Sequence, residues 1–133
     1  MAKPFSEKEN AESAWDDLVV SILAVNHYPL ERTYVLLSGL RGQGLTNPSA
    51  LADGDVDDIE RRLRTSGYDR GPFMTRLFAQ RLAALGNLIR TKGAPECEQA
   101  LGGSNRATIK ELLLPVKGIG PVVLGNFFML REV

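Results

Sequence analysis

The sequence is poor in the residue types that form metal and redox centres, with one cysteine, Cys97, and one histidine, His27. A single cysteine excludes an intramolecular disulfide and a cysteine-ligated iron–sulfur cluster, and a single histidine excludes a cluster of histidine ligands. Cys97 lies in the polar stretch APECEQ, where we expect a loop and no role for the thiol. We therefore expect no metal centre or cofactor built on these residue types.

Long apolar stretches are missing as well. No run of about 18 apolar residues occurs, so no membrane span is expected. The polar, acidic beginning, MAKPFSEKENAESAWDD, resembles neither a signal peptide nor a basic transit peptide. Because 44% of the 133 residues are hydrophobic, we expect a single domain over residues 1–133 with its own core. Because the sequence shows no targeting pattern, we expect the protein in the cytoplasm.

Charges of both signs are present in equal number but are unevenly distributed. Residues 1–60 contain 4 lysines and arginines against 11 aspartates and glutamates, whereas residues 61–133 contain 12 against 5. This asymmetry has two readings. Either the basic second half binds a polyanion, or the two halves attract each other within the fold. Charge by itself does not decide between them.

Apolar residues recur at helical spacing along most of the chain, and alternating segments are almost absent. The pattern predicts an all-α bundle of roughly seven helices joined by short connections. Asn47–Pro48 and Asp55 are suited to begin helices, Gly67 to end one, and Ser104 or Asn105 to cap the helix before the last. One helix is expected to carry Tyr34, Val35, Leu37 and Leu40 without interruption. The stretch GAPECEQALGGSN is expected to be a loop with at most one short turn of helix.

The longest predicted helix begins at Pro72. Its expected buried stripe consists of Phe73, Leu77, Phe78, Leu82, Leu85, Leu88 and Ile89.

The most informative segment is LLLPVKGIGPVVLGNFFML, which starts at Leu112. A leucine-rich helix stops near Pro115, and Pro121 is well placed as the first residue of the next helix, where its missing N–H costs nothing. The segment therefore predicts a helix, a tight hairpin and a second helix over about residues 105–131.

The hairpin has the residue types of an anion site. Gly118 and Gly120 allow positive φ and let another backbone or a phosphate come close, while Ile119 between them points inward. The second helix begins with free N–H groups, beside Lys117. A lone Gly-x-Gly is equally compatible with an ordinary turn between helices.

Taken in order, these segments resemble the helix-hairpin-helix DNA glycosylase superfamily, which includes endonuclease III, adenine glycosylase and the 3-methyladenine glycosylases. Four pieces carry the resemblance, which covers roughly Ala14 to Arg131. They are WDDLVVSILAVNHYPLERTYVLL, LTNPSALA, IERRLRTSGYDRGPFMTRLFAQRLAAL and the hairpin segment. The resemblance implies a six-helix barrel domain, beside which a damaged base is flipped out of duplex DNA.

The resemblance also implies functional residues. Lys117, Gly118, Ile119 and Gly120 would hold a phosphate of duplex DNA, in the family often through a monovalent cation, with Val122 near the DNA. The same comparison implies no iron–sulfur cluster, because the cluster cysteines are missing.

Asn26 takes the place of a polar residue that, in several members, fills the gap left by the flipped base, and His27 is adjacent. From the residues alone, Asn26 is also a suitable C-terminal cap for the first helix before Pro29, and His27 a surface histidine of the same turn.

The chain departs from the family in its catalytic residues. Val122 stands where members with lyase activity have a lysine, so Schiff-base chemistry by that route is excluded. The family's catalytic aspartate would fall beyond Val133. Among other carboxylates, Asp16 and Asp17 are expected on the surface of the first helix and Glu111 on a helix face. Catalysis is therefore left open.

Two functions of different class follow. The first is a DNA-binding protein of the base-excision-repair glycosylase type, which binds duplex DNA, damaged or plain. The second is a non-catalytic helical module for protein–protein interaction. In that case the apolar last helix, Val122 to Leu130 with Phe127 and Phe128, would face a partner or a second copy of the chain.

Overall fold

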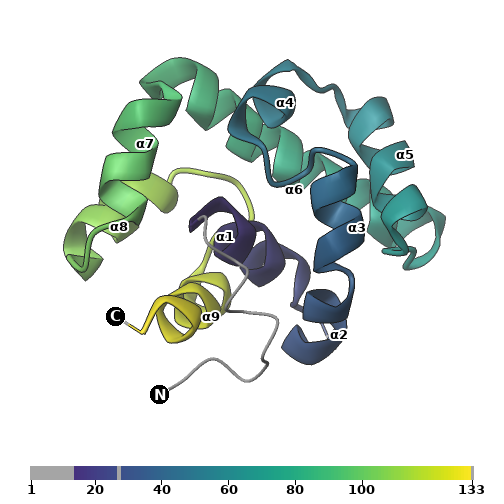
Figure 1. Ribbon diagram of the computed structural model, residues 1–133, viewed down its shortest axis with the longest axis horizontal. Coiled ribbons are helices and arrows are strands. Elements are labelled where there is room, and N and C mark those ends of the chain that lie inside the picture. Colours follow the sequence, from purple (N-terminus) through teal and green to yellow (C-terminus); the bar gives the residue numbers. More distant parts are fainter. Residues whose placement is uncertain (1–13, 27, 133) are drawn as a thin grey trace.

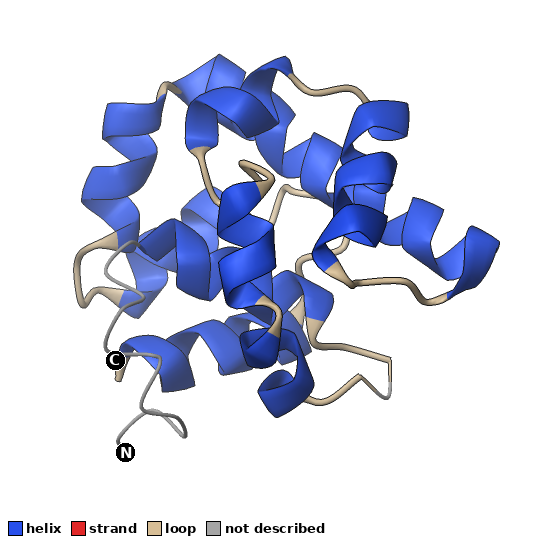
Figure 2. Cartoon of the chain, turned by 45° about the vertical axis from the view of Figure 1, so that its right-hand side comes forward, coloured by secondary structure: helices blue, strands red, loops and turns tan. Residues whose placement is uncertain are grey.

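The computed structural model describes residues 14–26 and 28–132, and these residues form nine helices and no strand (Figures 1 and 2). The predicted all-α class is therefore confirmed. The helices are α1 (Ala14–Leu23), α2 (Leu30–Val35), α3 (Leu37–Gly42), α4 (Pro48–Asp53), α5 (Val56–Ser66), α6 (Gly71–Lys92), α7 (Ala94–Leu101), α8 (Arg106–Leu113) and α9 (Pro121–Arg131).

Helix α1 is the centre of the fold, and it packs against α9, α6, α2 and α3 (Figure 1). Every residue from Trp15 to Leu23 is buried, because neighbouring helices leave this short helix no solvent-facing side. The expectation that Asp16 and Asp17 lie on the surface is wrong, since they are only 4% and 0% exposed. Arg41 and Arg131 come from other elements to neutralise them.

Helix α6 is the platform for α4 and α5, which pack along it, and for α7, which follows it. Most of its predicted buried stripe is buried. The expectation that Phe73 is buried is wrong, because this side chain is 78% exposed. At 100° per residue, Phe73 lies roughly 140° around the helix from Phe78, away from the core.

Caps form where the sequence places them. The Asn47 side chain accepts from the N–H groups of Ser49 and Ala50 at the start of α4. Asp55 accepts from Asp58 N–H, and Asn105 from Thr108 N–H. Local side-chain chemistry is thus sufficient to set these helix ends.

Two helix assignments differ from expectation. The predicted loop around Cys97 contains α7, because Cys97 and Leu101 lie one turn apart and are both buried in the core. The helix expected through Tyr34 and Leu40 is divided into α2 and α3. At Leu36 the N–H donates to the carbonyl of Thr33, which tightens the turn there.

The C-terminal helix α9 is already covered. Phe127 and Phe128 belong to the core, and α9 packs against α1. The Asn126 amide donates to the carbonyl of Ala24 at 3.2 Å, which fixes α9 to the end of α1. The apolar face expected to bind a partner is therefore used within the fold. Self-association itself stays a prediction.

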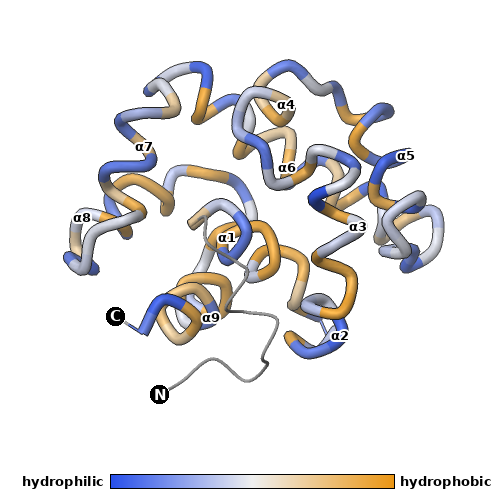
Figure 3. The backbone as a smooth tube through the Cα atoms, in the orientation of Figure 1, coloured by the Kyte–Doolittle hydropathy of each residue, from blue (hydrophilic) through white to orange (hydrophobic). Residues whose placement is uncertain are grey.

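Hydrophobic residues gather along α1 and α9, whereas α5 and α7 alternate hydrophobic and hydrophilic residues (Figure 3). Among the described helices, none combines the length and the apolar character that crossing a bilayer requires.

Candidate functional site

The predicted helix, hairpin and helix are present as α8, a turn over residues 114–120, and α9. Within the turn, Val116 N–H donates to the Leu113 carbonyl at 2.9 Å, and Ile119 N–H donates to the Val116 carbonyl at 3.1 Å. Val116 and Ile119 are buried, and Lys117 between them is exposed. The turn is thus held by two apolar side chains while its tip faces solvent, as predicted for Ile119.

The start of α9 leaves backbone donors available. Gly120 precedes the helix without a side-chain cap, and Pro121 has no N–H. In the described part of the chain, the N–H groups of Gly118, Gly120 and Val122 donate to no protein acceptor. The Val122 side chain is 64% exposed beside them. Unpaired donors at the start of an eleven-residue helix are the elements of an anion site.

The two hairpin glycines differ in backbone conformation and in the space around them. Gly118 has φ +95°, the left-handed region that glycine occupies at little cost. Gly120 has φ −129°, which any residue adopts, and a Cβ added there would meet no atom within 4 Å. The expectation of positive φ thus holds only for Gly118. Neither conformation nor packing within the chain therefore requires glycine at position 120.

Several arginines of the fold are paired with carboxylates, whereas the hairpin lysine Lys117 pairs with none that the structure describes. Five arginines of the second half pair with carboxylates of the first half, namely Arg61, Arg62, Arg64, Arg76 and Arg131. Arg61, Arg62 and Arg64 pair within α5, which spans the division at residue 60, so of these five only Arg76 and Arg131 link separate elements of the two halves. Within the described residues, Arg81, Lys110 and Lys117 have no ion-pair partner, so positive charge remains for an external anion.

Asn26 lies after the end of α1 in the left-handed conformation, with φ +56°, and is exposed. Asparagine is one of the few residues that adopt this conformation readily. Because α1 ends at Leu23, Asn26 belongs to the turn after the helix, and the expectation that it caps the helix is not met. The guanidinium of Arg70 donates to the carbonyls of Val25 and Asn26 and so fixes the turn. His27 lies outside the described residues, and a contact of Asn26 with DNA stays a prediction.

Arg70 also lies over three aromatic rings, with its guanidinium carbon 5.0 Å from the ring centre of Tyr28 and 5.2 Å from that of Phe78. The third ring is that of Tyr68, whose hydroxyl donates to the carbonyl of Leu23 at 2.8 Å. Burial raises the pKa of Tyr68 to about 12. Burial, together with the hydrogen bond to Asp17, raises the pKa of Tyr34 as well.

These two tyrosines predict a loss of stability at alkaline pH. A tyrosine with pKa about 12 in the fold and about 10 when unfolded stabilises fully below pH 10, and this contribution is lost as pH rises toward 12. Tyr68 alone corresponds to a loss of about 3 kcal/mol over that interval. Urea denaturation between pH 8 and pH 11 measures the slope, which should be shallower in Tyr68→Phe. Equal slopes in both proteins would contradict the assignment.

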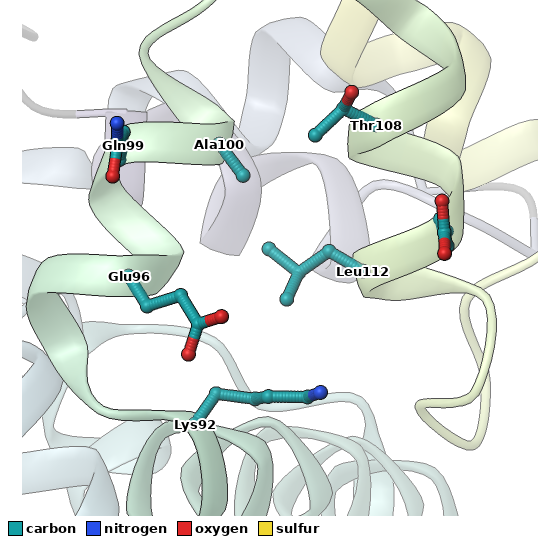
Figure 4. A pocket seen from close by; sticks show the side chains of 7 residues that line it. Lys92, Glu96, Gln99, Ala100, Thr108 and Leu112 are labelled. Atoms are coloured by element: carbon teal, nitrogen blue, oxygen red, sulfur yellow. The ribbon is translucent and has the colours of Figure 1, made fainter.

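A separate groove of about 420 Å³ lies where the end of α6 meets α7 and α8 (Figure 4). Its lining consists of Lys92, Glu96, Gln99, Ala100, Thr108, Glu111 and Leu112. Figure 4 shows Glu96 and Leu112 pointing toward its centre, with Lys92 below them. It contains none of the hairpin residues, and its two carboxylates oppose binding of a polyanion. The hairpin is therefore the better candidate for a phosphate site.

Sequence reasoning missed two arginines near these positions. Arg70 supports the Asn26 turn, and Arg81 lies against Gly118. Both are distant in sequence from the segments they contact, and each resembles an ordinary polar residue of its own segment. The only sequence signal for these two residues was the excess of basic residues in the second half of the chain. Asp16 and Asp17, by contrast, are occupied by ion pairs and are not available as catalytic groups.

Comparison of the chain with protein-family models, with curated proteins and with solved structures finds no match.

Proposed function

We propose that this protein binds duplex DNA by holding a backbone phosphate at the hairpin. The observation that carries the proposal is the set of N–H groups of Gly118, Gly120 and Val122, which donate to no acceptor in the described part of the chain, beside open space at Gly120. Lys117 supplies an exposed ammonium beside them. A phosphate oxygen accepts from several such donors at once, and the helix dipole favours the same charge.

Binding through the phosphate backbone carries little sequence preference and weakens as salt rises. The positive charge left at Lys117 and Lys110, which pair with no carboxylate among the described residues, supports this mode. The net charge of the chain is zero, so a local basic surface, and not overall charge, has to attract the DNA.

The resemblance to helix-hairpin-helix DNA glycosylases refines the proposal to recognition of damaged DNA, with Asn26 entering the gap at a flipped base. The order of the helices and the exposed position of Asn26 support it. Lyase chemistry through a lysine at the position of Val122 is not part of the proposal. Asp16 and Asp17 are buried in ion pairs with Arg41 and Arg131. We therefore propose DNA binding and do not include base excision in the proposal.

Gly120→Ala is expected to weaken duplex binding by about tenfold or more, because the added methyl group stands between the hairpin donors and the phosphate. Stability should change by less than about 0.5 kcal/mol, because the methyl group meets no protein atom within 4 Å. Fluorescence anisotropy with a labelled duplex measures affinity, and urea denaturation measures stability.

Gly42→Ala is the matched control. Gly42 ends α3, is exposed, and also has nothing within 4 Å of an added Cβ. Its affinity should equal that of the parent. If Gly120→Ala bound DNA as tightly as Gly42→Ala, the hairpin would not be the binding site.

The damage preference is tested by comparing plain duplex with duplex that carries an abasic-site analogue, at two salt concentrations. Tighter binding to the abasic duplex is expected, and products of the same incubation show whether a base is excised. Absence of binding even at low salt would overturn the proposed function.

A further inference from the structure

Arg81 on α6 reaches the hairpin that joins α8 to α9. A Cβ placed on Gly118 would lie 2.2 Å from both Cδ and Nη1 of Arg81 and 2.8 Å from its Nε. The arginine side chain therefore occupies the space directly over the backbone of Gly118. Glycine at this position is needed for the positive φ and also to leave room for Arg81.

The guanidinium of Arg81 has no partner of its own. Its Nε is buried, and it is the sole buried side-chain nitrogen or oxygen without a hydrogen bond in the described part of the chain. A guanidinium stays charged at any physiological pH. A buried charged donor left unsatisfied destabilises a fold by more than a neutral one. Because the side chain as a whole is half-buried, the other two guanidinium nitrogens of Arg81, which also donate to no acceptor among the described residues, stay accessible to an anion.

Other arginines of the fold are treated differently. Arg41 donates twice to Asp16, and Arg131 donates to buried Asp17. Arg70 has carbonyl acceptors and aromatic rings. Arg81 lacks both kinds of partner and lies against Gly118 of the hairpin. An arginine that serves only to support the hairpin would be expected to donate to its carbonyls, and Arg81 does not.

We infer that Arg81 is a phosphate-binding residue of the hairpin site, supplying from α6 a fixed positive charge and a fork of donors beside the backbone donors of Gly118 and Gly120. The inference rests on the proposed function and deepens it, because α6 as well as the hairpin would then contribute donors to the phosphate site. Arginine matches a phosphodiester through paired N–H groups, which a lysine cannot reproduce.

The test is Arg81→Met, which keeps an apolar stem over Gly118 and removes the charge and the donors. Affinity for a short labelled duplex should fall by about tenfold. The slope of log affinity against log salt should become shallower by about 0.9, the value for one lost phosphate contact. Arg81→Lys should recover part of the slope but only part of the affinity.

Arg90→Met is the matched control. Arg90 lies on the same helix, about 13 Å further along it, and donates to the carbonyl of Ala52. The change in net charge is the same, so a general electrostatic effect would appear equally in both variants. Affinity and salt slope of Arg90→Met should stay close to the parent.

Stability separates binding from a supporting role. Because Arg81 is unsatisfied in the free protein, Arg81→Met should have the same melting temperature as the parent or a higher one. A lower melting temperature with an unchanged salt slope would show that Arg81 only supports the turn, and would overturn the inference. So would unchanged affinity.

If the parent protein bound no DNA, the proposed function would fail. Titration with inorganic phosphate would then test whether Arg81 belongs to an anion site. Phosphate should shift the amide resonances of Gly118 and Gly120 in the parent and not in Arg81→Met. Equal shifts in both proteins, or shifts in neither, would overturn the anion site.

Discussion

Replacing Asp17 with alanine is expected to lower the free energy of unfolding by about 3 kcal/mol. The carboxylate is fully buried and accepts from the Tyr34 hydroxyl at 2.7 Å and from Nη1 of Arg131 at 3.1 Å. Both donors lose this acceptor in the variant. The value is at the low end for breaking a buried pair, because the Arg131 side chain is 22% exposed and can turn toward water. Urea denaturation followed by circular dichroism measures the loss.

Asp53→Ala is the control for this change. Asp53 is exposed in the last turn of α4, so its loss should alter stability by no more than about 0.5 kcal/mol. Asp17→Ala combined with Arg131→Met should cost less than the sum of the two single changes, since the two residues share one interaction. A small and additive effect of Asp17→Ala would mean that this carboxylate does not hold α1, α2 and α9 together.

Loss of Asp17 is also expected to affect DNA binding, because this residue holds α9 in place. Arg131 near its end is tied to Asp17, and its first turn carries the hairpin donors. A weakened Asp17 pair therefore loosens the helix that orients the proposed phosphate site. We expect DNA affinity to fall in Asp17→Ala at temperatures where the parent is still fully folded.

Gly86→Ala is expected to cost about 2 kcal/mol or more. Gly86 is buried where α4 crosses α6, and an added Cβ would lie 2.2 Å from the carbonyl oxygen of Leu51. The obstacle is backbone, so no side chain can turn aside, and the two helices have to separate. Thermal and urea denaturation both report the change.

Gly125→Ala is the matched control and should have the opposite sign. Gly125 is exposed within α9, and an added Cβ would meet no atom within 4 Å. Alanine there should stabilise the helix by about 0.5–1 kcal/mol. If Gly86→Ala raised stability as Gly125→Ala is expected to, helix propensity and not the contact of α4 with α6 would dominate at position 86.

The hairpin could be predicted because its signals are local. Pro121 and Gly118 act through their own backbone geometry, and Ile119 needs only an apolar interior on one side of the turn. The caps at Asn47 and Asp55 formed for the same reason. The unpaired N–H groups at the start of α9 could also be predicted from the sequence, since they follow from the helix itself.

Residues whose environment depends on other helices were misjudged. Asp16 and Asp17 looked like surface carboxylates because α1 is too short to show that both its sides are covered. Phe127 and Phe128 looked like an interaction surface because nothing in their own segment shows that α1 receives them. The sequence did not predict α7 because most of its residues are polar. Only Cys97 and Leu101 of this helix are buried.

The sequence by itself determined the helical class, most helix ends and the hairpin with its backbone donors, because each depends on residues within a few positions of one another. The tertiary structure decided which charges are satisfied. It buries Asp17 against Arg131 and leaves Arg81 unpartnered over Gly118. Burial and pairing depend on which helix faces meet, and that is set by packing between segments far apart in the chain.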